Sequence, residues 1–372
     1  MKKIISFLLI ICTIVSVTAC SENFIVRIPP AVTTDTVETE KRDAEASSPT
    51  TEVETVVPET TTPVRETFDV KLSFAGDMLL ASFKNETKYY NFNDFVNKNP
   101  SSYFLEKVRH IFEADDFTVV NLENVFTDRE LVEIEKDYEP AYWYRTKTSN
   151  IEILTSSSVE AVSLANNHTE DYGAEGFEDT LNTVKTAGLY YGTAYETMYL
   201  EKEGFTVAVI CTGLWSQYQT QYVQYYLDAA KEKSDFQVVF FHGGTERIHE
   251  PEDWKINACR QLVDGGADLI IGGHPHVLQP METYNGVDII YSIGNFCFGD
   301  GYKPENRTII YQTTLTVDRE TMELAEKNSE VIPCYVWTGE RNNYQPAVIE
   351  NEAERERVLS FMRWECDSPV EE

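Results

Sequence analysis

Ile270-Ile271-Gly272-Gly273-His274-Pro275-His276 is the segment from which the architecture of this chain can be inferred. A short apolar run that begins after Asp268 and stops at two glycines is typical of a buried strand. The histidines that follow would lie at the carboxyl edge of the sheet, where α/β proteins usually bind ligands. Imidazole is a common metal ligand near neutral pH, and proline stiffens the backbone between the two rings. Alone, a His-x-His pattern is weak evidence for a metal site.

Other strand-like segments end in residues of the same kind. The runs around Leu72, over 117–122, over 159–164 and over 236–241 are each followed by a carboxylate, amide or imidazole. Four of the six histidines in the chain occupy such positions, which favours one shared site over scattered core histidines. Each residue has a structural alternative, such as a Gly-Asp turn or a polar Asn-Asn turn. The candidate ligand-type residues are Asp77, Glu123, Asn167, His168, His242, His274 and His276.

This mixture of donors indicates the kind of ion. Carboxylate, amide and imidazole groups together suit Zn²⁺, Mn²⁺ or Fe²⁺ better than Ca²⁺, which prefers oxygen ligands only. A carboxylate can bridge two ions, so we expect one or two divalent ions in each chain. Such ions polarise substrates as Lewis acids and provide a nucleophile at neutral pH.

The order of patterns along the chain predicts an α/β sandwich with ligands at strand ends. Further strands are expected at 206–211, 287–293 and 308–317, with helices through Phe177 to Gly188 and over 253–263. Met78 to Leu80 are expected to begin a turn. We place the main domain at 67–318 and a C-terminal extension that packs on it at 319–372. Within the extension, a strand at 331–337 and a charged helix at 352–365 are expected.

The first residues predict export and lipid anchoring. Lys2 and Lys3 precede an apolar run that ends in Val17-Thr18-Ala19-Cys20, which resembles the lipobox of a bacterial lipoprotein. We therefore expect a signal peptide at 1–19 and a lipidated Cys20, which would hold the protein at the outer face of the cell membrane. A plain N-terminal anchor is the alternative. Residues 20–66 are rich in Thr, Glu and Pro and should form a disordered tether.

The charge of the chain restricts its partners. Thirty-one Lys and Arg residues against 62 Asp and Glu residues give a formal net charge of −31. A field of this sign argues against nucleic-acid binding and against electrostatic attraction to anionic membranes. A polyanionic substrate would need a local patch or a metal ion to overcome this charge.

Several motifs in the expected order give a specific resemblance. They are Ala165-Asn166-Asn167-His168-x-x-Asp171-x-Gly173, His242-Gly243-Gly244-x-Glu246, Gly273-His274-Pro275-His276-Val277 and Tyr291-Ser292-Ile293-Gly294-Asn295-Phe296. Together they resemble the CapA-type poly-γ-glutamate capsule biosynthesis family over about residues 71–317. That family is similar to calcineurin-like metallophosphoesterases, so the resemblance implies a four-layer αββα sandwich with a two-metal site.

The resemblance also implies a role for each ligand-type residue. Asp77 and His276 would hold the first metal, Glu123 would bridge, and His168 would act as a general acid. The second metal would be held by Asn167, His242 and His274. The phosphoesterase pattern has a histidine two residues after its aspartate, where this chain has Leu79. The first site is therefore expected to be one ligand short.

Four other residues have open interpretations. Glu246 either orients His242 from behind or is a surface carboxylate. Arg145 either clamps a substrate anion or is a solvated arginine beside packed aromatic residues. Asn166 is a candidate for supporting the site, and Asn295 either caps a turn or reaches the metals. The tyrosine-rich run 218–226 is interpreted as an amphipathic surface helix, with a polymer-contacting ledge as the alternative.

Two functions remain possible from the sequence. The first is a metal-dependent hydrolase or transferase acting outside the membrane on poly-γ-glutamate or a related envelope polymer. The second is a non-catalytic scaffold or polymer-binding component of a capsule synthesis or export complex. His168 favours the first, whereas Leu79 and the negative charge favour the second.

Overall fold

The computed structural model describes residues 65–83, 91–138, 140–299 and 306–370. The predicted signal peptide, the lipidated Cys20 and almost all of the predicted tether lie outside the described residues. In the part of the chain that is described, no helix is long and apolar enough to cross a membrane.

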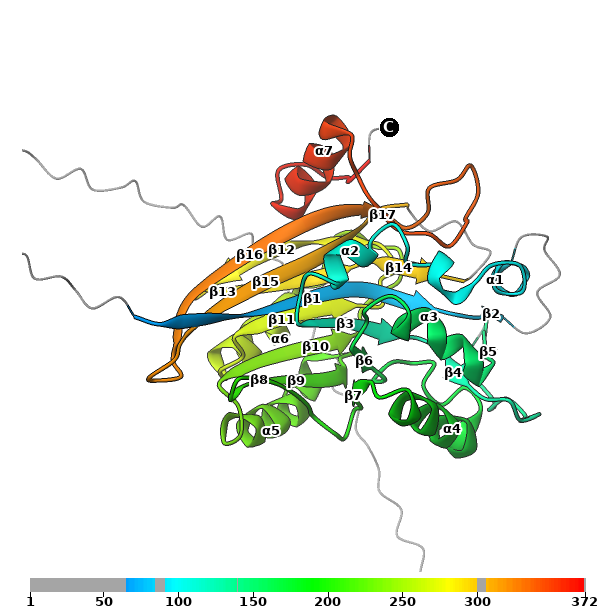
Figure 1. Cartoon of the computed structure of the whole chain (residues 1–372), viewed down its shortest axis with the longest axis horizontal. Coiled ribbons are helices and arrows are strands. Elements are labelled where there is room, and N and C mark those ends of the chain that lie inside the picture. The colour runs from blue at the N-terminus through cyan, green and yellow to red at the C-terminus, as the bar shows by residue number, and fades with distance from the viewer. Residues whose placement is uncertain (1–64, 84–90, 139, 300–305, 371–372) are drawn as a thin grey trace, which may run out of the picture. The chain divides into compact units, whose positions relative to one another are not determined.

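The first sheet is built around the long strand β1 (Figure 1). On one side of β1 the strands run parallel to it, and on the other side they form antiparallel pairs. Strand β14 (Asn295–Phe298) pairs with the end of β1. Across the sheet the order is β17 (Ala347–Val348), β16 (Leu324–Tyr335), β15 (Thr308–Asp318), β1 (Thr67–Leu79), β3 (Phe117–Leu122), β6 (Ala161–Ser163) and β7 (Tyr190–Gly192).

The second sheet has a parallel centre with an antiparallel strand at each edge. Its order is β12 (Leu278–Tyr284), β13 (Val287–Ile293), β11 (Leu269–Gly273), β10 (Phe236–His242), β9 (Phe205–Gly213) and β8 (Met198–Lys202). A small third sheet contains β2 (Ser82–Phe83), β5 (Tyr144–Thr146) and β4 (Val125–Phe126).

The two large sheets pack face to face, and helices cover their outer faces. Between the sheets, the rings of Phe74 and Phe240 meet edge to face with centroids 6.0 Å apart. The outer face of the first sheet packs on α1 (Phe92–Val96), α2 (Arg109–Phe112), α3 (Glu152–Thr155) and α4 (Gly173–Thr186). The second sheet packs on α5 (Thr220–Lys231) and α6 (Asp253–Asp264). This arrangement confirms the predicted four-layer αββα sandwich. Short 3₁₀ helices occupy 101–103, 148–151 and 217–219.

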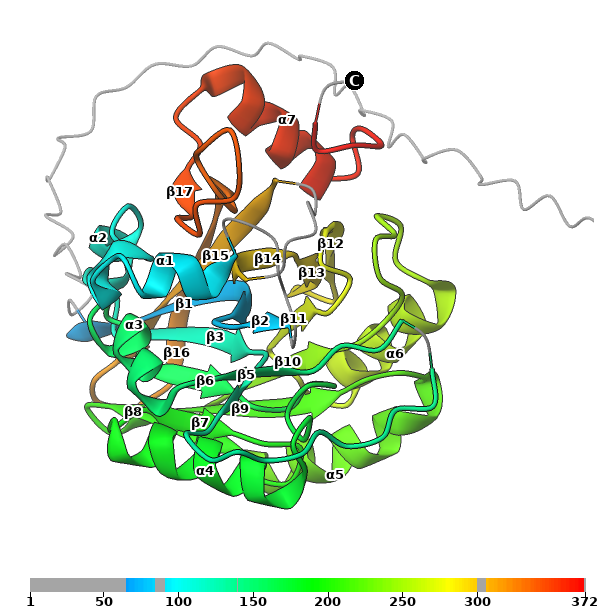
Figure 2. The ribbon, with the colours of Figure 1, turned by 90° about the vertical axis from the view of Figure 1, so that its right-hand side faces the viewer.

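The C-terminal segment is more closely integrated than an extension that packs on the domain. Strand β16 pairs along nearly the whole length of β15, so residues after 318 belong to the first sheet. Helix α7 (Glu352–Met362) then contributes Val358 and Phe361 to the core between the sheets. It lies apart from the other helices in both ribbon views (Figures 1 and 2).

Three predicted boundaries were wrong. Strand β1 does not turn at Met78 but continues to Leu79, because Met78 pairs with Leu122 and both side chains are buried. Strand β6 is shorter than 159–164, since the Val159 N–H donates to Leu154 and closes the preceding helix. Strand β16 begins before residue 331. All residues of its first half except Lys327 are exposed, so this half shows no alternation of buried and exposed side chains.

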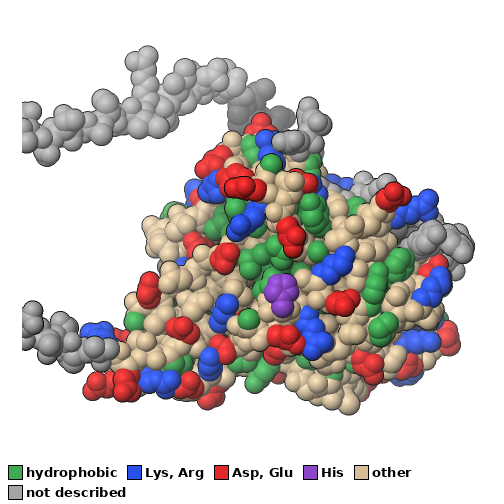
Figure 3. Space-filling model, turned by 45° about the horizontal axis from the view of Figure 1, so that its top comes forward, with side chains coloured by type: hydrophobic (Ala, Val, Ile, Leu, Met, Phe, Trp, Pro, Cys, Tyr) green, Lys and Arg blue, Asp and Glu red, His purple; other side chains and the backbone are tan. Residues whose placement is uncertain are grey.

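The surface seen in Figure 3 reflects the composition of the chain. Lys and Arg side chains are scattered among Asp and Glu side chains and form no continuous basic area on this face. The view therefore supplies no candidate surface for a nucleic acid.

Candidate metal centre

The predicted ligand-type residues meet where the parallel strands of both sheets end. Asp77 lies near the end of β1, and Glu123 follows β3, with its N–H donating to the Met78 carbonyl at 2.8 Å. His242 is the last residue of β10, and His274 follows the last residue of β11. Because both sheets present their carboxyl edges to the same place, residues far apart in sequence become neighbours.

Three groups of described side chains have ligand atoms within 4.8 Å of one another, and two of these groups share a buried carboxylate. Glu123, His242 and His274 form one group, and Asp77, Glu123 and His276 form the other. Glu123 belongs to both, which is the arrangement expected of a carboxylate that bridges two ions. Asn167 lies beside the first group, with its Oδ1 2.8 Å from His242 Nε2.

The carboxylate of Glu123 gives the strongest indication that this is a cation site. It is fully buried, and neither oxygen has a hydrogen-bond partner among the described residues. Its Oε1 lies 3.5 Å from His242 Nε2 and 3.9 Å from His276 Nε2. Leaving a buried carboxylate without hydrogen bonds is costly, so such a group normally has a cation partner. The donor set therefore fits a borderline divalent ion.

Asp77 is held by hydrogen bonds and by neighbouring imidazoles. Asn121 Nδ2 donates to its Oδ1 at 2.8 Å, and the His274 N–H donates to its Oδ2 at 2.9 Å. Burial alone would raise the pKa of Asp77, but His242 and His276 outweigh burial and hold this pKa below its usual range. The carboxylate is therefore charged and able to bind a metal.

The imidazoles respond to these carboxylates in different ways. Burial opposes protonation of His242, but Glu123 and Asp77 raise its pKa to about 9. The same balance of burial against the two carboxylates raises the pKa of His276 to about 10. Burial and the two neighbouring histidines lower the pKa of His274 below its usual range. The raised pKa values of His242 and His276 thus reflect the negative charge that Glu123 and Asp77 concentrate in this centre.

The loop that carries His274 and His276 has an unusual backbone. Their φ angles are 92° and 59°, in the left-handed region that side chains other than glycine rarely adopt. A Cβ at Gly273 would lie 2.7 Å from Asp77 Oδ1, so only glycine fits against that carboxylate. Strained backbone of this kind persists where the surrounding structure imposes it, and it is common at functional sites.

His168 lies at the edge of this cluster in a fixed orientation. Its Nδ1 is 2.8 Å from Asp171 Oδ2, and its Nε2 is 3.9 Å from Glu123 Oε1. Because a carboxylate only accepts, the Nδ1–H donates to Asp171 and leaves Nε2 directed toward the cluster. Asp171 also pairs with Lys136 at 2.6 Å, and both side chains are almost entirely buried.

Asn166 connects several of these groups instead of pointing at a metal. Its Nδ2 donates to Asn121 Oδ1 and to the Leu122 carbonyl at 3.0 and 2.8 Å, and its Oδ1 accepts from the His168 N–H at 3.0 Å. Asn121 Nδ2 in turn lies 3.1 Å from His242 Nδ1. Asn166 therefore links β3 with the loop that carries His168.

Sequence reasoning missed two residues of the centre. Asn121 lies two positions before Glu123, so strand alternation could have placed both on one face. Trp215 packs its ring 4.7 Å from the ring of His274 and 6.0 Å from that of His242. It comes from the loop after β9, and no pattern in the sequence connects it with the histidines.

The remaining candidates lie at different distances from the centre. Asn295 Oδ1 is 2.9 Å from His276 Nδ1, whereas its Nδ2 is buried without a partner among the described residues. Glu246 is exposed, and its carboxylate lies within 4.8 Å of ligand atoms of His274 and His276. It is therefore at the outer side of the centre and not behind His242.

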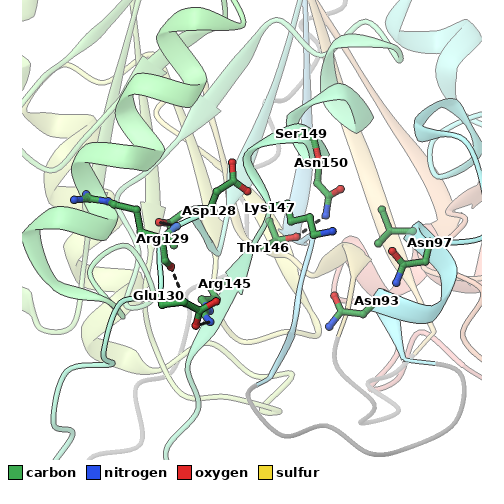
Figure 4. A pocket seen from close by; sticks show the side chains of 12 residues that line it. Asn93, Asn97, Asp128, Arg129, Glu130, Arg145, Thr146, Lys147, Ser149 and Asn150 are labelled. Atoms are coloured by element: carbon green, nitrogen blue, oxygen red, sulfur yellow. Dashed lines mark hydrogen bonds and ion pairs between the residues drawn. The ribbon is translucent and has the colours of Figure 1, made fainter.

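Arg145 lies in a separate cavity of about 560 Å³ that none of the ligand-type residues lines (Figure 4). Its Nη2 pairs with Glu130 at 3.0 Å, and its Nη1 donates to the Arg129 carbonyl at 2.9 Å. The guanidinium also lies 5.3 Å from the ring of Tyr172. Through these contacts Arg145 binds the segment of Arg129 and Glu130, and it does not reach the metal centre.

Leu79 lies in hydrophobic surroundings next to the group formed by Asp77, Glu123 and His276. It is fully buried and clusters with Tyr144 and Phe298. The ring of Phe298 lies 4.9 Å from that of His276. The group of Asp77, Glu123 and His276 thus has apolar side chains on this side.

Comparison with known proteins shows which protein family this chain resembles. Residues 71–300 match the sequence model described as bacterial capsule synthesis protein PGA_cap. The PGA biosynthesis protein CapA of Bacillus subtilis is 31% identical over 64% of this chain and 67% of its own length. The capsule biosynthesis protein CapA of Bacillus anthracis is 26% identical over 78% of this chain and 74% of its own length.

Solved structures resemble the chain more distantly. A novel phosphatase from Mycoplasma pneumoniae aligns with a TM-score of 0.43 and 15% identity, covering 72% of this chain and 95% of that one. A similarity of this size supports no argument about activity.

Proposed function

The chain belongs to the bacterial capsule synthesis protein family PGA_cap, and from this premise we propose that it is a metal-dependent hydrolase or transferase of poly-γ-glutamate capsule synthesis. The observation that carries the proposal is the buried Glu123 carboxylate, which has no hydrogen-bond partner in the described structure and is shared by two groups of ligands. A purely structural carboxylate would be expected to have hydrogen-bond donors.

The residues that would hold the metals follow from the two groups. Asp77, Glu123 and His276 would bind one ion, and Glu123, Asn167, His242 and His274 would bind the other. Divalent ions of Mn, Zn or Fe bound there would supply Lewis-acid chemistry at neutral pH. They would also offset the negative charge of a chain at −31, which otherwise repels an anionic polymer.

His168 would supply the proton for the leaving group. Asp171 fixes its Nδ1–H, so the opposite nitrogen is directed toward the buried cluster. General acid catalysis of this kind typically contributes about 10²–10⁴ in rate. In this proposal Asp171 is a positioning residue, because it acts on the reaction only through His168.

The place of action is part of the same proposal. The segment before Cys20 and the Thr-, Glu- and Pro-rich residues after it support an extracytoplasmic lipoprotein that a tether holds away from the membrane. In that position the protein would meet the polymer and other proteins of a capsule synthesis complex.

A scaffold without catalysis is the second candidate. The observation that favours it is Leu79, since the apolar surrounding leaves the first metal group without a further ligand on that side. A scaffold would need the fold, but it would not need the proton of His168.

Complementation of a deletion strain separates these two candidates. His168→Asn, His274→Ala and the surface control His110→Asn should be expressed at matched protein levels, with metal content measured for each purified protein. We expect His168→Asn to retain metal and fail to restore capsule, His274→Ala to lose both, and His110→Asn to restore capsule fully. Full restoration of the capsule by His168→Asn would refute the proposal that the protein acts as an enzyme.

A further inference from the structure

A groove of about 650 Å³ opens directly beside the metal centre. Asn166 and Asn167 of the centre line one part of it, and so does Trp215, whose ring packs against His274. The groove is therefore continuous with the place where the proposed chemistry would occur, and it is distinct from the cavity that contains Arg145.

Aromatic side chains from three separate segments converge on this groove. Tyr195 comes from the loop between β7 and β8, Trp215 from the loop after β9, and Tyr222 from helix α5. Their exposed fractions are 80%, 41% and 73%. Large exposed aromatic surfaces are unfavourable in water, and gathered in one concave place they usually mark a binding site.

The surface helix alone does not account for this arrangement. Helix α5 is amphipathic, and Tyr225 on it is 70% exposed without lining the groove. Tyr225 is thus an exposed tyrosine of this helix outside the groove, although its ring meets that of Tyr226 at 5.3 Å. Tyr195 and Trp215 belong to other segments, so the periodicity of the helix cannot explain why they face the same space.

The polar groups of the groove are almost entirely uncharged. Amide and hydroxyl groups come from Gln219, Thr169, Thr193 and Thr212, whereas the amide of Asn166 is engaged in the metal centre. Glu170 is the one charged side chain among the described residues that line it, and no lysine or arginine is present among them. A polymer with a carboxylate on every unit would meet no cation here and one like charge.

We propose that this groove is a subsite for an uncharged saccharide chain. The flat faces of Trp215 and the tyrosines can stack on the C–H faces of sugar rings, and the amides and hydroxyls can bond to sugar hydroxyls. The role as a subsite rests on the proposed function of the metal centre, whereas binding of the saccharide does not.

Isothermal titration calorimetry of the full-length protein tests this inference. The probes are the uncharged hexasaccharides of N-acetylglucosamine, of β-linked glucose and of α-linked glucose, with poly-γ-glutamate as the anionic comparison. We expect at least one hexasaccharide to bind with a dissociation constant of about 1 mM or below. This binding should be the same for the metal-loaded protein and for protein from which a chelator has removed the metal. Tyr222→Ala and Tyr195→Ala should each weaken it about two- to tenfold, the range for one aromatic contact.

Tyr225→Ala is the matched control, since it removes an equally exposed tyrosine from the same helix and should leave the affinity unchanged. Failure of all the hexasaccharides to bind would overturn the inference. So would a loss of affinity in Tyr225→Ala as large as that in Tyr222→Ala. Tighter binding of poly-γ-glutamate that depends on Tyr222 would also overturn it. Saccharide binding by a protein that shows no metal-dependent turnover would support the groove and refute the proposed function.

Discussion

Asp171→Asn should destabilise the protein strongly and misplace His168. The Asp171 side chain is fully buried and receives Lys136 at 2.6 Å, the Tyr144 N–H at 2.8 Å and His168 Nδ1 at 2.8 Å. Asparagine has nearly the same shape, but its single carbonyl oxygen cannot satisfy all of these donors. Its amide group would face either the ammonium of Lys136 or the ring nitrogen of His168.

The size of the destabilisation follows from the burial of the ion pair between Lys136 and Asp171. The Lys136 side chain is only 5% exposed, so the substitution leaves a buried ammonium without its counter-charge. Removing one partner of a buried ion pair costs about 3–5 kcal/mol. The free energy of unfolding of a domain is typically about 5–15 kcal/mol, so this loss of stability is large enough to measure by denaturation.

Urea denaturation followed by circular dichroism measures this loss. Lys136→Met and the double variant Lys136→Met/Asp171→Asn complete the cycle. We expect the double variant to be more stable than the sum of the single losses predicts, with a coupling of about 1–3 kcal/mol. A loss below about 1 kcal/mol for Asp171→Asn, or a coupling near zero, would refute the reasoning.

Three further predictions concern other parts of the chain. Titration of metal-stripped protein should show one tightly and one weakly held ion, and Leu79→His should strengthen the weaker site; two equal affinities in the unmodified protein would contradict this. Cys20→Ala should release the protein from membranes or block its processing, as seen by fractionation and mobility. Burial raises the pKa of Glu160 to about 7, so the folded state binds the extra proton and stability falls as pH rises from about 4.5 to 7. Because Glu160 is only partly buried, Glu160→Gln should stabilise the protein by about 1 kcal/mol at pH 8 and by little at pH 4, as measured by urea denaturation.

The gathering of the ligand-type residues was predictable because it depends on local patterns. Each buried strand shows as an apolar run, and the residue after it must lie at the carboxyl edge of the sheet. The amino-acid sequence alone therefore predicts that Asp77, Glu123, His242 and His274 meet. The alternation of strands and helices predicted an α/β sandwich, whereas its four layers were implied by the family resemblance.

What could not be predicted depends on the approach of distant segments. Trp215 reaches the histidines only because the loop after β9 lies beside that after β11. The sequence around Arg145 is also compatible with a substrate clamp, but β5 belongs to the small third sheet, and there Arg145 pairs with Glu130 away from the centre. The exposed half of β16 is a strand because β15 supplies its hydrogen bonds, and a pattern of hydrophobicity cannot reveal that.

Turnover by the metal-loaded full-length protein tests the central claim most directly. The wild-type protein and His168→Asn, shown to contain the same amount of metal, should be compared on poly-γ-glutamate and on a simple phosphodiester. We predict that the wild-type protein turns over at least one of them and that His168→Asn is slower by about 10²–10⁴. Equal rates for the two proteins, or no turnover of either substrate by metal-loaded wild type, would contradict the account.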